Sequence, residues 1–133
     1  MGDTIRCLSV GYKILTDAQH DEVSQLFWDC GIPEYEGPEV LVVVWDEHGD
    51  IIAAMTSCAG DWAVAVHPSR QQEGLARKMV EAALQAGESG YMVAASEEGL
   101  YFLHSLYYHL SDEQKESLEV PCWAELEAME VHV

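Results

Sequence analysis

The chain has 133 residues, of which 49% are hydrophobic, and its 24 acidic and six basic residues give a formal net charge of −18. This hydrophobic fraction excludes an intrinsically disordered chain, and the length fits one domain over residues 1–133. The charge repels duplex DNA and anionic membranes, which argues against nucleic acid as a partner. It favours cationic partners, or it serves solubility alone.

The cysteines and histidines predict no metal site. The four cysteines, at positions 7, 30, 58 and 122, form no close pair, and the histidines form no H-x-H or H-x-x-x-H motif. Scattered cysteines without a signal peptide indicate a reducing, cytoplasmic setting. No hydrophobic run approaches the roughly 18 residues that a membrane span requires.

The first predicted elements are a strand and a helix. Every second residue is hydrophobic over 8–14, which predicts a half-buried strand. Thr16 and Gln19 have the spacing of a capping box, so a helix is expected to begin at Thr16 and to end at the Gly-Ile-Pro sequence of residues 31–33. Residues 33–39 contain proline, glycine and acidic residues and are expected to form a loop.

Three strands are predicted in the middle of the chain. Residues 40–46 are almost all hydrophobic and mostly β-branched, which is typical of a strand buried on both faces. A Glu-His-Gly-Asp turn connects this run to a return strand at 51–57, so the two are expected to form a hairpin. A third strand is predicted at 62–66, ending before Pro68.

The remaining sequence predicts two helices and further strands. A helix is expected over 72–85, a strand over 91–95 and a second helix around 100–110. Residues 117–133, which a proline splits, are expected to form two short strands. Antiparallel strands followed by a β-α-β crossover predict an α/β (α+β) fold with a mixed, mostly antiparallel sheet flanked by helices.

Half of the basic residues gather at the start of the helix that follows the third middle strand. Arg70, Arg77 and Lys78 are opposed there only by Glu73, which gives a local charge of +2. The first turn of a helix has free backbone N–H groups, and Gly74 permits close approach of the backbone. These features predict an anion site suited to phosphate. The alternative is an ordinary helix with solvated charges, and the common nucleotide-binding motifs are absent.

Residues 66–76 resemble the signature of the GNAT superfamily of N-acetyltransferases. Val66-His67-Pro68 matches the V-x-P sequence that ends a strand in this family, and Gln71-Gln72-Glu73-Gly74-Leu75-Ala76 matches [QR]-x-x-G-x-[GA]. The predicted element order is similar to that fold over most of the chain. The resemblance implies an acyl-CoA N-acyltransferase-like fold with acetyl-CoA as co-substrate.

The resemblance also implies which residues contact acetyl-CoA. In the family, backbone N–H groups of the loop bind the pyrophosphate, and here they belong to Gln72, Glu73, Gly74, Leu75 and Ala76. Gln71 opens the signature, and Arg77 stands where a basic residue touches phosphate. The preceding strand aligns the pantetheine arm and the acetyl carbonyl through its backbone, a role that maps to Val64, Ala65 and Val66.

Two residues are catalytic candidates. In the sequence LYYHLS, which is similar to the family's L-Y-x-x-x-G-F, Tyr107 takes the position of the tyrosine that protonates the departing thiolate. A tyrosine with a pKa of about 10 can donate a proton at neutral pH. Its spacing from Leu103 fits a core residue equally well. Asp61, at the start of the third middle strand, is the nearest candidate for a general base and is also a reasonable turn residue.

Two departures from the family pattern leave the function open. Glu73 stands in the phosphate loop where a neutral or basic residue is usual, and the short acidic segment 33–39 suits a cationic acceptor. The sequence predicts an acetyl-CoA-dependent N-acetyltransferase that acts on a cationic small molecule or a protein amine. The alternative is a catalytically inactive GNAT-fold protein that binds a basic partner as an inhibitor or interaction module. A structural subunit without a ligand is a weaker alternative.

Overall fold

The computed structural model describes residues 2–8, 15–31, 39–58, 60–71, 73–92 and 97–120. For Glu39, Cys58, Tyr107 and residues 97–100 it describes the backbone alone. The strands are β1 (Thr4–Cys7), β2 (Glu39–Trp45), β3 (Ile51–Cys58), β4 (Asp61–Val66), β5 (Gly90–Tyr91) and β6 (Leu118–Glu119). The helices are α2 (Asp17–Asp29), the 3-10 helix η1 (Pro68–Arg70), α3 (Leu75–Gln85), α4 (Glu97–His109) and α5 (Asp112–Ser117).

The strands form one mixed sheet in the order β1-β2-β3-β4-β5-β6. Neighbouring strands from β1 to β4 are antiparallel, whereas β5 is parallel to both β4 and β6. The parallel pair of β4 and β5 is the β-α-β crossover predicted from the sequence, with α3 as its helix. The predicted α/β fold, with a mixed, mostly antiparallel sheet flanked by helices, is therefore confirmed.

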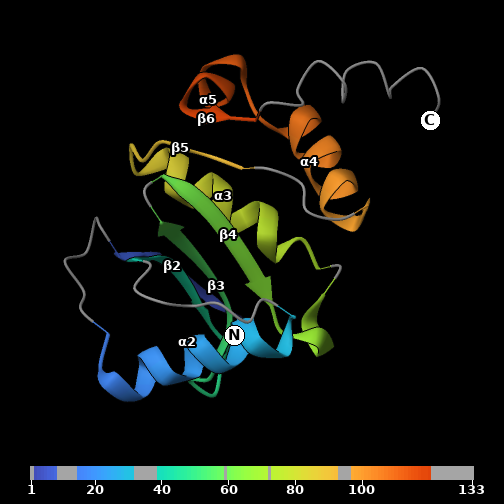
Figure 1. Ribbon diagram of the computed structural model, residues 1–133. Helices are drawn as coiled ribbons and strands as arrows, with labels where there is room; N and C mark the ends of the chain where they lie inside the picture. The colour runs from blue at the N-terminus through green and yellow to red at the C-terminus, as the bar shows by residue number, and fades with distance from the viewer. Residues whose placement is uncertain are drawn as a thin grey trace.

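Helices cover both faces of the sheet (Figure 1). On one face α2 buries Phe27 and its neighbours against β2, β3 and β4. On the other face α3 and α4 bury residues such as Met79 and Leu106 against the same strands. The valines at positions 42–44 of β2 are fully buried, at 0% exposure, which confirms that this strand is covered on both faces. Each such side chain contributes roughly 1.5–3 kcal/mol relative to an exposed one.

The first strand differs from the prediction. It spans Thr4–Cys7, Leu8 follows it, and residues 9–14 lie outside the described part of the chain. Two patterns of alternating hydrophobic residues meet here. From Leu8 onward the hydrophobic residues occupy even positions, whereas Ile5 and Cys7 occupy odd positions and also alternate with polar residues. The earlier pattern pairs with β2, with Ile5 opposite Val44, and the later pattern lies mostly outside the described residues. Alternation alone does not choose between two phases, since only the partner strand sets the register.

Helix boundaries follow local capping signals. The predicted capping box is present, with the Thr16 hydroxyl accepting from the Gln19 N–H at 3.2 Å and the Gln19 side chain accepting from the Thr16 N–H at 2.9 Å. A second capping box, from Ser111 and Gln114, begins α5, which the prediction did not include. Helix α3 begins at Leu75 and not at residue 72, because η1 and a turn precede it.

The later strands agree with the prediction only in part. Strand β5 is limited to Gly90–Tyr91 within the predicted range around 91–95, of which residues 93–96 lie outside the described residues. Strand β6, at Leu118–Glu119, is one strand of the predicted pair over 117–133. Residues 121–133 also lie outside the described part.

The side chain of Trp62, from β4, packs against β5 and requires a glycine at position 90. A Cβ atom at Gly90 would overlap Nε1 and neighbouring atoms of the Trp62 indole, which is buried at 3% exposure. We expect Gly90→Ala to lower the free energy of unfolding by about 1–3 kcal/mol, the usual effect of overpacking. Urea denaturation measures this change. Gly2→Ala is the control, because a Cβ there meets nothing within 4 Å; equal midpoints for the two variants would contradict the prediction.

Candidate functional site

The junction between β4 and α3 presents backbone donors that have no partner among the described residues. Gly74 is the N-cap of α3, with φ 79° and ψ 13° in the left-handed region, and no side chain caps the helix. The first intrahelical bond runs from the Lys78 N–H to the Gly74 carbonyl at 3.1 Å. The N–H groups of the three residues between them therefore have no acceptor within the helix. Together with the positive end of the helix dipole, they make this junction a candidate site for an anion.

The backbone of β4 has one edge toward β3 and one away from it. The His67 N–H donates to the Ile52 carbonyl at 2.8 Å, and the register places Ala65 opposite Ala54. Because backbone groups alternate between the two edges of a strand, those of Ala65 face β3. Those of Val64 and Val66 consequently face the other edge. Of the three residues predicted to align the pantetheine arm, the geometry thus leaves two with outward-facing backbone groups.

The outer edge of β4 is paired only near its start. The Tyr91 N–H of β5 donates to the Gly60 carbonyl at 2.8 Å, and Asp61 pairs with Tyr91. The next residue, Met92, donates instead to the carbonyl of Glu119 in β6, at 3.0 Å. Within the described residues no strand pairs with β4 beyond this point, and β4 continues to η1 (Figure 1). A stretch of strand edge that has no partner strand in the described part of the chain therefore leads to the start of α3.

Two side chains occupy the end of this edge. The Val66 carbonyl accepts hydrogen bonds from Gln71 Nε2 and from the Cys30 thiol, both at 3.2 Å. Burial raises the pKa of the Cys30 thiol, so it remains a protonated donor at neutral pH. Gln71, the first residue of the sequence signature, thus fixes the turn between β4 and the helix. Among the described residues, the N–H and C=O of Val64 and the N–H of Val66 on the outer edge have no hydrogen-bond partner.

The basic residues near this junction are offset by acidic ones. Arg70 pairs with Asp3 at 2.6 Å and with Glu73 at 2.9 Å. Its hydrogen bonds with Glu73 and Asp3 raise the pKa of Arg70, and hydrogen bonding to Arg70 lowers the pKa of Glu73. Arg77 lies 3.6 Å from Glu81. The predicted local charge of +2 did not include Asp3 and Glu81, which bring the cluster close to neutral.

Arg77 is the basic side chain that lies over the junction. Its Nη2 is the nearest atom, at 3.9 Å, to the position that a Cβ on Gly74 would take. Its Nε is buried and has no hydrogen-bond partner among the described residues, with Oε1 of Glu81 at 3.6 Å. A buried donor without a partner is uncommon, and an anion bound at the junction would lie close to this guanidinium. Arg77 is therefore a candidate phosphate contact, as the resemblance implied.

The other loop residues take different positions. Leu75 is buried in the core at 3% exposure, so its side chain anchors the start of α3. Ala76 is half-buried in the same turn, and its small side chain leaves the neighbouring N–H groups accessible. Gln72 lies outside the described residues.

The two catalytic candidates belong to different elements, β4 and α4. Asp61 is exposed at the start of β4, three residues before Val64, which corresponds to roughly 10 Å along a strand. Tyr107 belongs to α4, and its side chain lies outside the described residues. One turn earlier, His104 has a buried Nε2 that has no hydrogen-bond partner in the part of the chain that the structure describes, and its ring meets Tyr108 edge-on at 5.2 Å. The sequence reasoning assigned no role to His104, and its helical spacing from Tyr107 was the available signal.

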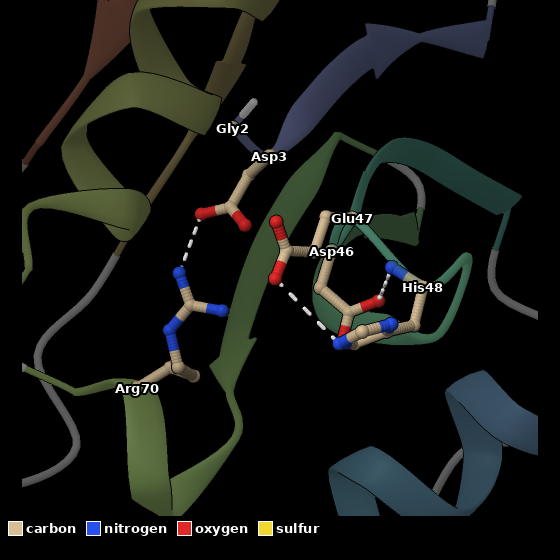
Figure 2. A pocket seen from close by; sticks show the side chains of 6 residues that line it. All are labelled: Gly2, Asp3, Asp46, Glu47, His48 and Arg70. Carbon is tan, nitrogen blue, oxygen red and sulfur yellow. Dashed lines mark hydrogen bonds and ion pairs between the residues drawn. The ribbon is translucent and has the colours of Figure 1, made fainter.

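A separate cavity lies at the end of the β2–β3 hairpin (Figure 2). Its volume is about 420 Å³, and it is lined by Gly2, Asp3, Asp46, Glu47, His48 and Arg70. Asp46 accepts hydrogen bonds from the backbone N–H groups of His48 and Asp50, each at 2.9 Å, which closes the predicted turn. The Asp50 N–H chiefly lowers the pKa of Asp46. The carboxylates of Asp3 and Asp46 are thus already bound to groups of the chain itself.

Neither a metal centre nor a membrane span is found in the part of the chain that the structure describes. No group of three or more His, Cys, Asp or Glu side chains in these residues could hold a metal ion. No helix among them is long and hydrophobic enough to cross a membrane.

Comparison with protein-family models identifies one match. The acetyltransferase (GNAT) family model matches residues 8–111, which is well over half of the chain. Comparison with curated proteins and with solved structures gave no significant match. The matched region includes α2, the sheet from β2 to β5, and the junction between β4 and α3. The chain therefore belongs to the GNAT family of acetyltransferases, whose members generally take the acetyl group from acetyl-CoA.

Proposed function

We propose that this chain is an acetyl-CoA-dependent N-acetyltransferase that acts on an amine of a cationic small molecule or of a protein. The observation that carries the proposal is the continuity of two sets of free backbone groups. The outward-facing groups of Val64 and Val66 lead along β4 to the uncapped N-terminus of α3. An extended ligand with an acyl carbonyl at one end and a diphosphate at the other matches this order of donors.

The chain's own residues have distinct roles in this proposal. The N–H groups at the start of α3, with Arg77, bind the diphosphate. The Val64 and Val66 backbones align the pantetheine arm, and a strand N–H polarises the thioester carbonyl. Asp61, or a water molecule, removes a proton from the acceptor amine so that its nitrogen can attack the carbonyl. Tyr107 protonates the departing thiolate.

The acidity of the chain supports a cationic acceptor. A net charge of −18 attracts polyamines, amino sugars and basic protein segments over the range of the Debye length. The same charge repels free acetyl-CoA, which is itself an anion. The nearly neutral cluster around Arg70 and Arg77 reduces this repulsion where the diphosphate would bind.

The alternative proposal is an inactive family member that binds a basic partner. Glu73 in the phosphate loop was part of the reason for this alternative. Glu73 is paired with Arg70, so its charge is locally compensated and is compatible with coenzyme binding. This pairing favours the enzyme over the inactive protein. Turnover in a screen of amines would separate the two functions.

Coenzyme binding is the first test of the proposal. We expect acetyl-CoA to raise the melting temperature, because a ligand at 100 times its Kd stabilises the folded state by about 2.7 kcal/mol. For a domain of this size the increase is several degrees. Differential scanning fluorimetry measures it, with ATP at the same concentration as a control for unspecific binding of polyphosphate. An unchanged melting temperature at millimolar acetyl-CoA, or an equal increase with ATP, would argue against the proposed function.

A further inference from the structure

Arg70 holds the carboxylate of Glu73 through several hydrogen bonds. Arg70 Nε lies 3.1 Å from Oε1 and 2.9 Å from Oε2 of Glu73, and Nη2 lies 2.9 Å from Oε1. Multiple bonds between a guanidinium and a carboxylate fix the geometry of the pair as well as strengthening it. The direction of the Glu73 carboxylate is therefore set by η1, where Arg70 is located.

The position of Glu73 makes this direction important. Glu73 immediately precedes Gly74, the N-cap of α3, so a free carboxylate there is within reach of the uncapped N–H groups. Acidic side chains near the N-terminus of a helix are attracted by the helix dipole. A free Glu73 would therefore compete with a diphosphate for the same donors and would also repel it. In the structure its two oxygens are bound by Arg70 instead.

Arg70 is held from a second side by Asp3. Its Nη2 lies 2.6 Å from Oδ2 of Asp3, a residue 67 positions earlier in the chain. Figure 2 shows the guanidinium turned toward this carboxylate. The two side chains are 27% and 22% exposed, so the pair is partly shielded from water and from salt. Because Asp3 directly precedes β1, the sheet itself holds Arg70 in place.

We propose that Arg70 is a positioning residue for the coenzyme, which acts by keeping the Glu73 carboxylate away from the N–H groups that bind the diphosphate. This inference rests on the proposed function. The Nε and Nη2 atoms of Arg70 are bound to Glu73 and Asp3, so we expect Arg70 to affect the phosphates through Glu73. The contribution of Arg70 to coenzyme binding therefore depends on the presence of the Glu73 carboxylate.

Double-mutant measurements of CoA binding test this dependence. We expect Arg70→Gln to weaken CoA binding about fivefold, the effect of one unpaired charge roughly 4 Å from another in water. In the Glu73→Gln background, the additional Arg70→Gln change is expected to have no effect on the Kd. The loss in the single variant is also expected to shrink between about 0.05 M and 0.5 M NaCl, because salt screens exposed charges. Isothermal titration calorimetry measures each Kd.

Arg6→Gln is the matched control for the loss of one positive charge. Arg6 is exposed on β1, so this variant changes the net charge equally without changing the loop. A loss for Arg70→Gln that persists in the Glu73→Gln background would overturn the inference, because Arg70 would then contact the phosphates or support the loop fold. So would an equal loss for Arg6→Gln. If the unmodified chain itself binds no CoA, the proposed function fails first, which is a distinguishable result.

Discussion

Gly74→Ala is expected to weaken acetyl-CoA binding by about 10- to 100-fold. Gly74 has φ 79°, and a residue with a Cβ atom loses roughly 1–2 kcal/mol in this left-handed region. The chain can relieve the strain only by rotating the peptide groups at the start of α3, which misdirects the N–H donors. A hydrogen bond to a charged group contributes about 1.5–3 kcal/mol, and every 1.4 kcal/mol changes the Kd tenfold. Isothermal titration calorimetry measures the change.

Gly87→Ala separates this effect from a loss of helix stability. Gly87 ends the same helix with φ 88°, and the Gly87 and Glu88 N–H groups bond to the Leu84 and Ala83 carbonyls as in a Schellman motif. Both substitutions introduce left-handed strain in α3, so both are expected to lower the melting temperature to a similar extent. Only Gly74→Ala is expected to weaken the coenzyme complex. A comparable loss of affinity for Gly87→Ala would mean that the junction does not bind the diphosphate.

Tyr107→Phe is expected to lower kcat by about 100-fold or more while leaving the Kd for acetyl-CoA unchanged. General acid catalysis by a positioned side chain contributes about 100- to 10,000-fold, and phenylalanine retains the ring but not the hydroxyl. The thiolate would then have to leave without a proton from the protein. Release of free CoA thiol over time measures kcat, with the amine acceptor that a screen of polyamines, amino sugars and lysine peptides identifies.

The neighbouring Tyr108 provides the control for this substitution. Tyr108 lies on the same helix and is 47% exposed, so Tyr108→Phe removes a hydroxyl of the same kind from the surface. This variant is expected to retain its turnover. Unchanged turnover of Tyr107→Phe would assign Tyr107 to packing, which its spacing from Leu103 in the sequence also allowed. A second proton donor would then have to be sought, and the buried ring nitrogen of His104 is the nearest candidate on α4.

The arrangement of charges explains why basic residues gather at a helix start where the dipole disfavours them. Arg70 is paired with Asp3 and Glu73, and Arg77 lies near Glu81, so the cluster is not an open patch of positive charge. In the proposed function, binding of the diphosphate at this junction is therefore expected to depend mainly on oriented backbone donors and on Arg77. Such donors are directional and act at short range, which suits a protein whose overall charge repels anions.

The sequence by itself determined the elements that depend on neighbours within a few residues. The capping box of Thr16 and Gln19, the turn closed by Asp46 and the left-handed end of α3 at Gly87 all follow from contacts two to five residues apart. The strand-to-helix junction at Gly74 could likewise be predicted from the local sequence, because its conformation depends on one glycine. The run of valines in β2 was also sufficient to predict burial of this strand on both faces, because a strand without a polar side must be covered on each of them.

Only the tertiary structure decided which residues of the site act together. The partner of Arg70 is Asp3, and no periodicity connects residues 67 positions apart. The phase of β4, which turns Val64 outward and Ala65 toward β3, depends on the register with Ala54. The position of β1 likewise depends on its pairing with β2. Strand register and long-range ion pairs arise from packing between distant segments. The local sequence therefore predicts the helices, strands and turns of this site, whereas the fold determines which of their residues pair.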